Sequence, residues 1–247
     1  MRKKMNRTSV IILIVAALTV AVPSVIAYSD DDHDRKGEQL ITAIRSDNTD
    51  KALSLLKSGA DPNYVSSLNG TRVAAIEIAC EYKNVVVVRY LLSHGVKPWL
   101  VRQDKSALIR RTLEYPAHHP SLNVNEIMQI LIDHGADVNM TYPKGPLPII
   151  IAIRYGHEEA VKFLVDHGAD VNLAMREQAS PLWVATRFGN KLVVRLLLNA
   201  GADPSKTGNT FDQLIKLAQE YDGKEIVAIL KDAMAKRKAA ASSVPKK

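Results

Sequence analysis

Apolar residues fall along most of the chain in short runs whose spacing is that of one face of an α-helix. Each run closes on a glycine, and these glycines return at intervals of 36, 40, 33 and 33 residues. They are Gly59, Gly95, Gly135, Gly168 and Gly201. A recurring interval near 33 residues predicts an array of similar helical units rather than one irregular domain.

The residues around the glycines repeat as well. The run endings read "LLKSGADPN", "LLSHGVKPW", "LIDHGADVN", "LVDHGADVN" and "LLNAGADPS". Upstream of the last two lie "GPLPIIIAIRYGHEEAVKFLV" (145–165) and "ASPLWVATRFGNKLVVRLLL" (179–198). In these two stretches the prolines are 33 residues apart, and so are the alanines Ala152 and Ala185.

The repeated residues predict two helices in each unit. Ser180 and Pro181 form a helix start, since serine caps a helix and proline suits its first position. An apolar stripe through Leu197 follows, and the glycine after it supplies the left-handed residue that ends a helix. Two such helices cannot bury their apolar faces alone, so neighbouring units must stack. Adjacent units should share Ile149, Leu164, Leu182 and Leu197.

This pattern resembles ankyrin repeats, whose units read G-x-T-P-L-H-x-A-A-x-x-G-H and then V-V-x-L-L-L-x-x-G-A-D-x-N. The resemblance covers residues 36–234 and implies an all-α solenoid of about six helix-pair units with short hairpin loops. We place the units at 36–63, 70–99, 104–139, 145–172, 177–205 and 208–234. The third unit departs most from the pattern, and it carries an insertion, "EYPAHHPSLN" (114–123).

The repeated "DHGAD" holds Asp, His and Asp within five residues and raises the question of a metal or catalytic site. A zinc site needs three or four ligands that converge on one point, whereas these copies stand one unit apart. Aspartate in a turn bonds nearby backbone, and histidine in the last turn of a helix is mildly favourable. We therefore interpret "DHGAD" as part of the architecture. We expect neither metal nor cofactor, because the chain holds no nucleotide-binding, zinc-protease or serine-hydrolase motif.

The first 27 residues predict export. Four basic residues precede a 13-residue apolar run, 10–22, and Pro23 and the short stretch "VIA" (25–27) follow it. This is the pattern of a secretory signal peptide with cleavage after Ala27. The alternative is a membrane anchor, for which the apolar run is short. Residues 28–35 are then an acidic linker, and the protein is periplasmic.

The formal charge of +7 arises at the two ends of the chain. Nine of the 33 basic residues lie in the signal peptide and in the tail 235–247, which leaves 24 against 26 acidic residues in the body. The basic balance therefore does not predict nucleic-acid binding. We expect the basic tail to be disordered and solvated.

The single cysteine, Cys80, excludes an intramolecular disulfide, and we interpret it as a buried packing residue rather than a reactive thiol.

Aromatic residues occupy one equivalent position in four units, at the end of the first helix. In ankyrin repeats that position faces the concave surface and varies between binders. We therefore predict a row of partner contacts, with packing of the rings on one another as the alternative. The row is Tyr82, Tyr155, Phe188 and Tyr221, with Glu81, Arg154, Arg187 and Glu220 beside it; Tyr115 in the insertion, Tyr142 and Arg176 complete the candidate set.

The resemblance implies a binding protein and not an enzyme. Exported bacterial proteins that resemble this one include immunity proteins, which neutralise toxins of contact-dependent and type VI secretion systems. Some of those toxins are phospholipases that act on the envelope. We therefore expect a cognate toxin as the partner, and a monomer when the protein is free. The alternative is a scaffold or protective partner of a periplasmic enzyme.

Overall fold

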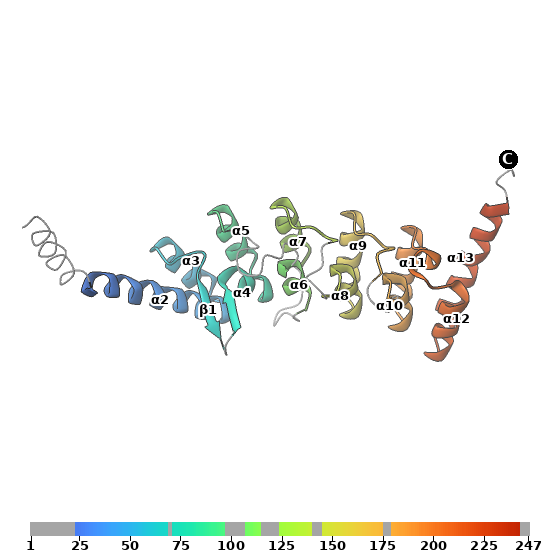
Figure 1. Ribbon diagram of the computed structural model, residues 1–247, viewed down its shortest axis with the longest axis horizontal. Coiled ribbons are helices and arrows are strands. Elements are labelled where there is room, and N and C mark those ends of the chain that lie inside the picture. Colours follow the sequence, from blue (N-terminus) through green and yellow to red (C-terminus); the bar gives the residue numbers. More distant parts are fainter. Residues whose placement is uncertain are drawn as a thin grey trace, which may run out of the picture.

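The structure is a computed structural model that describes residues 23–68, 71–96, 107–114, 124–139, 145–174 and 179–242. Helix pairs follow one another in a single elongated row (Figure 1). In chain order the pairs are α2 (Pro23–Arg45) with α3 (Thr49–Lys57), α4 (Ala75–Glu81) with α5 (Val85–Ser93), α6 (Ala107–Glu114) with α7 (Val124–Asp133), α8 (Pro148–Arg154) with α9 (Glu158–Asp166), α10 (Pro181–Arg187) with α11 (Lys191–Asn199), and α12 (Phe211–Glu220) with α13 (Lys224–Ser242). This arrangement confirms the expected all-α solenoid.

The pairs build two layers. First helices pack on first helices from α2 to α12, and second helices pack on second helices from α3 to α13. The two layers are visible as the lower and upper rows of Figure 1. Each helix thus contacts its own partner and the two adjacent pairs, so the row has no single centre. Its core is a continuous strip between the layers.

The helix boundaries follow from the residues that the sequence singled out. The hydroxyl of Ser180 accepts a hydrogen bond from the Trp183 amide at 3.2 Å, and Pro181 occupies the first position of α10. The glycines that follow α3, α5, α7, α9 and α11 all have φ between 81° and 93°. A side chain at such φ values is strained, which is why glycine recurs there.

Small residues at the crossing points allow the first helices to approach. Ala152 and Ala185 are fully buried, and Ala79 and Ala218 occupy the same place in the second and sixth pairs. The residues expected to be shared between units, Ile149, Leu164, Leu182 and Leu197, are each at most 1% exposed. Stacking against the next unit therefore completes the burial that one helix pair cannot achieve.

A short β-hairpin between α3 and α4 is an addition that the helical pattern did not predict. Strands β1 (Val65–Leu68) and β2 (Thr71–Ala74) pair antiparallel. The hydroxyls of Tyr64 and Ser66 both donate to Oε1 of Glu38 on α2, at 2.9 and 2.7 Å. These bonds fasten the hairpin to the first helix of the row.

Both ends of the row are more helical than expected. Helix α2 includes residues 28–35, which we expected to be a linker, and Asp32 pairs there with Arg35 and Lys36 at 2.6 and 2.9 Å. Helix α13 continues through residues 235–242, for which we expected no regular structure. Alanine, lysine and arginine favour helix, and no proline or glycine interrupts residues 224–242.

Arg237 on α13 explains how the last pair closes the row. Its guanidinium donates to the Ala202 carbonyl at 3.1 Å and pairs with Asp203 at 2.6 Å. It also lies 5.6 Å from the centroid of the Phe211 ring.

Among the described residues, no helix is long and apolar enough to cross a membrane. The apolar run of the expected signal peptide lies outside them.

The stacked core predicts a contrast between two leucines of α11. Leu197 is fully buried, whereas Leu192 is 57% exposed. Leu197→Ala should lower the free energy of unfolding by about 2–5 kcal/mol, because it removes buried surface and leaves a cavity. The same substitution at Leu192 should change it by about 0.5 kcal/mol or less. Urea titration followed by far-ultraviolet circular dichroism measures both; equal losses would contradict the stacking argument.

Candidate protein-binding surface

A repeated turn places the aromatic row. Tyr82, Tyr155, Phe188 and Tyr221 are the C-cap residues of α4, α8, α10 and α12. The residue after each of them has positive φ, between 54° and 71°. This left-handed residue turns the chain into the second helix and leaves the preceding side chain at the end of the first-helix layer. The four rings are therefore equivalent in space as well as in sequence.

Three members of the row are open to solvent. Tyr155, Phe188 and Tyr221 are 52%, 54% and 54% exposed, which makes them half of the large exposed hydrophobic residues in the described part of the chain. Tyr82 differs, because it is partly buried against the core. No ring contact joins any two of Tyr155, Phe188 and Tyr221, and Tyr155 lies 6.3 Å from His157. Packing of the rings on one another therefore does not account for these three.

The residues that precede the rings divide into two groups. Glu81 pairs with Arg111 of the next unit at 3.1 Å, and both side chains are largely buried. Arg154 and Arg187 are exposed, and the guanidinium of Arg187 lies 5.3 Å from the centroid of the Trp183 ring. Glu81 therefore contributes to the scaffold, whereas the two arginines stand beside exposed rings.

Three candidate residues, Tyr115, Tyr142 and Arg176, lie outside the described residues. They stay predictions of partner contacts.

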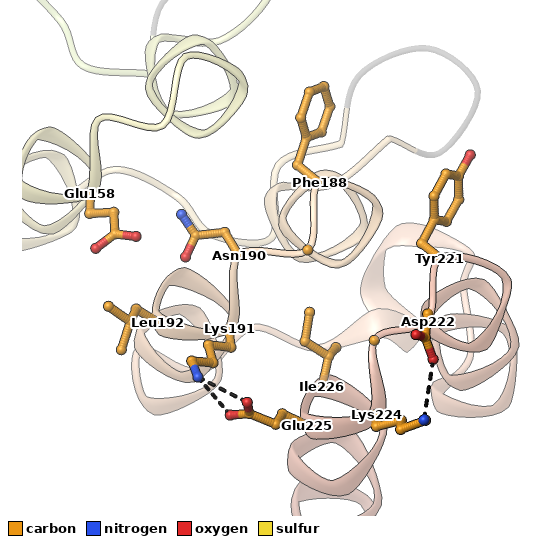
Figure 2. Close-up of a pocket in the computed structure, with 12 residues that line it drawn as sticks. Glu158, Phe188, Asn190, Lys191, Leu192, Tyr221, Asp222, Lys224, Glu225 and Ile226 are labelled. Carbon is orange, nitrogen blue, oxygen red and sulfur yellow. Dashed lines mark hydrogen bonds and ion pairs between the residues drawn. The ribbon is translucent and has the colours of Figure 1, made fainter.

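A groove between the fifth and sixth units adjoins the row (Figure 2). Its volume is about 860 Å³, and Phe188 and Tyr221 project from the two units on either side of it. Exposed Leu192 lines it from α11, where the sequence pattern would place a polar residue. Its charges are largely paired, Lys191 with Glu225 at 2.8 Å and Asp222 with Lys224 at 3.7 Å. The sequence reasoning did not predict this groove, because it forms between two units.

The repeated "DHGAD" forms bonds within the scaffold. The Nδ1 atoms of His134 and His167 lie 2.8 Å from the carbonyl oxygens four residues earlier, which ties each ring to the end of its own helix. Gln129 links two copies of the motif, because its amide bonds Asp133 at 2.8 Å and Nε2 of His167 at 2.9 Å. In the part of the chain that the structure describes, no three His, Cys, Asp or Glu side chains are placed to hold a metal ion.

Asparagine side chains connect the turns of successive units. The Asn172 amide donates to the Gly201 carbonyl at 3.2 Å, and its Oδ1 accepts from the Asp203 amide at 2.7 Å. Asn139 makes the same two bonds to the following unit, at 2.9 and 2.7 Å. The last residue of "DHGADVN" is therefore a bridge between units, a role that the sequence reasoning did not assign.

Cys80 is fully buried, and burial raises the pKa of its thiol to about 12. A thiol with so high a pKa stays protonated at neutral pH, and the thiolate is the nucleophile in cysteine chemistry. Its contacts fit the interpretation of a small packing residue. It neighbours the fully buried Ala79 at a crossing of first helices.

Comparison with known families agrees with this geometry. Residues 113–208 match the family model described as ankyrin repeats in three copies. The pairs α8 with α9 and α10 with α11 lie in this match, and the remaining pairs continue the same stacking. The fold is therefore consistent with an all-α ankyrin solenoid, and ankyrin repeats indicate a module for protein–protein interaction. No curated protein matches the chain.

The asparagine bridge between units should contribute measurably to the free energy of unfolding. Asn172→Ala should leave the Gly201 carbonyl and the Asp203 amide without their bridging partner and lower the free energy of unfolding by about 0.5–1.5 kcal/mol, because water can replace part of the lost bonding. Asn199→Ala is the matched control, since Asn199 is exposed and ends α11. Urea titration of the two variants measures the difference. An Asn172→Ala variant as stable as the control would show that the bridge contributes nothing.

Proposed function

We propose that this chain is an exported inhibitor that binds and neutralises a cognate toxin in the periplasm, such as an envelope-acting phospholipase. The observation that carries the proposal is the row of exposed aromatic rings on a rigid helical scaffold. A water-exposed ring leaves apolar surface in contact with water, and three such rings recur at the same place in successive units. Binding to a protein partner would remove that surface from water.

The chemistry of the row supports a protein as the partner. Tyrosine and arginine are enriched among the residues that dominate protein interfaces, because they combine apolar area with hydrogen bonding. Tyr155 follows Arg154 and Phe188 follows Arg187, so two units present such a pair. The helices that carry them are fixed by the core, so little order has to be gained on binding.

Two features support the more specific proposal of a periplasmic inhibitor. The basic and apolar start of the chain has the pattern of a signal peptide, which would deliver the protein to the periplasm. A single buried cysteine makes the fold independent of disulfide formation in that compartment. An inhibitor needs only a surface complementary to its target, which is what this scaffold offers.

Export predicts the start of the mature chain. Protein recovered from the periplasm should begin at or near Tyr28, as N-terminal sequencing would show. Leu13→Arg interrupts the apolar run and should keep the protein in the cytoplasm, because the run no longer enters the membrane as a signal. An intact Met1 in the membrane fraction would support the anchor interpretation instead.

The aromatic row predicts a separation of binding from stability. The partner is first captured from the periplasm on the immobilised mature chain. Tyr155→Ala and Phe188→Ala should each weaken binding to this captured partner by about 2 kcal/mol or more, with little change in Tm. Titration calorimetry and thermal melting measure the two quantities. Tyr90→Ala is the control, since Tyr90 lies on the second-helix layer and stacks on His94 at 3.9 Å. Unchanged affinity with a lowered Tm would show that the rings stabilise the fold and do not bind the partner.

Inhibition of the partner can be measured by the growth of cells that export it. Co-production of the chain should restore the growth of cells that export the captured partner, and Phe188→Ala should restore it less. Protection of the partner's activity, rather than its loss, would indicate a protective protein instead of an inhibitor.

A further inference from the structure

The charge on the exposed face of the first helices changes along the row. Exposed Arg154 and Arg187 lie on α8 and α10, whereas α12 carries exposed Lys216 between the exposed acidic residues Asp212 and Glu220. Among the described residues, neither arginine is in an ion pair. The positive charge that the scaffold leaves uncompensated therefore lies on α8 and α10.

The earlier units differ at the same positions. Glu81 pairs with Arg111 at 3.1 Å, and Glu114 pairs with Arg110 at 2.7 Å. In both pairs each side chain is less than a quarter exposed. The scaffold thus neutralises its own charges on α4 and α6 and does not do so on α8 and α10. The uncompensated charge therefore begins at α8, where the half-exposed rings also begin.

The groove between Phe188 and Tyr221 is suited to an uncharged side chain. Its charged lining residues are two lysines and three carboxylates, Glu158 among them, so the groove does not attract an anion from a partner. Exposed apolar surface from Phe188, Tyr221 and Leu192 remains. Figure 2 shows the two rings projecting to the same side of the groove, with the paired charges on its other side.

We infer that the face formed by α8, α10 and α12 binds an acidic segment of the partner, with an aromatic or aliphatic side chain at the Phe188–Tyr221 groove and carboxylates at Arg154 and Arg187. Arginine binds carboxylates through two parallel hydrogen bonds, and Trp183 holds the Arg187 guanidinium in place. Packed helices lie about 8–10 Å apart. A chain in the polyproline II conformation has three residues per turn and advances about 3.1 Å per residue, so carboxylates three residues apart lie on one face about 9 Å apart and match neighbouring units.

This inference rests on the proposed binding of a protein, but not on inhibition. Its test uses random peptides about twelve residues long, which span about 40 Å when extended and can cross three units. Peptides displayed on phage are selected on the purified chain, on the Arg154→Glu/Arg187→Glu variant, and on a Lys162→Glu/Arg195→Glu control. The control makes the same charge change in the same two units, on exposed residues of α9 and α11.

The wild-type chain and the control should select peptides in which Asp and Glu flank an aromatic or aliphatic residue. The Arg154→Glu/Arg187→Glu variant should lose these peptides or select basic ones. A selected acidic peptide, made with a fluorescent label, should bind this variant at least about tenfold more weakly by anisotropy, and should bind the wild type more weakly as salt rises. Its affinity for the control should change less than about twofold.

Selection of the same peptides by all three proteins, or of peptides without acidic residues, would overturn the inference. Circular dichroism confirms that the variants remain folded. The proposed function is judged separately, by the growth of cells that export the captured partner. Neutralisation that persists in the Arg154→Glu/Arg187→Glu variant would therefore leave the proposed function standing while the acidic-segment inference fails.

Discussion

Stacking of one helix pair on the next is the constraint on which this structure depends. Helices of seven to ten residues, such as α8 and α9, are too short to be stable alone in water. Their apolar faces are buried by both neighbours, with Ala152 and Ala185 at the crossings of the first helices and Leu164 and Leu197 fully enclosed in the second. Stability is therefore a sum over interfaces between units, and both ends of the row need special closure.

The polar residues that repeat with the units serve the same stacking. Asn139 and Asn172 bridge successive turns, and Gln129 bridges the second helices. At the end of the row Arg237 approaches the turn at Ala202 and Asp203 from α13. Each turn presents the same backbone carbonyl and amide to the preceding unit, so the side chain that bonds them recurs wherever the turn recurs. The repeated "DHGADVN" therefore reflects an interface between units that recurs along the row.

The exposure of the aromatic row follows from this architecture, and a binding partner can contact the rings there. The left-handed residue after each first helix leaves the preceding position outside the core, where packing does not choose its side chain. The scaffold accommodates a large ring there, as the half-exposed Tyr155 and Phe188 show. Their exposure and the neighbouring unpaired arginines therefore call for an explanation outside the fold, which a protein partner provides.

The sequence by itself determined the unit length, the helix pairs, the glycine ends and the equivalence of the row, because these follow from local spacing and backbone preference. Only the tertiary structure decided which members are exposed: Glu81 turned inward to Arg111, whereas Arg154 remained free of any partner among the described residues. It also decided the Phe188–Tyr221 groove and the role of Asn172. Each of these depends on atoms from two units about 33 residues apart, and a pattern within one unit carries no information about them.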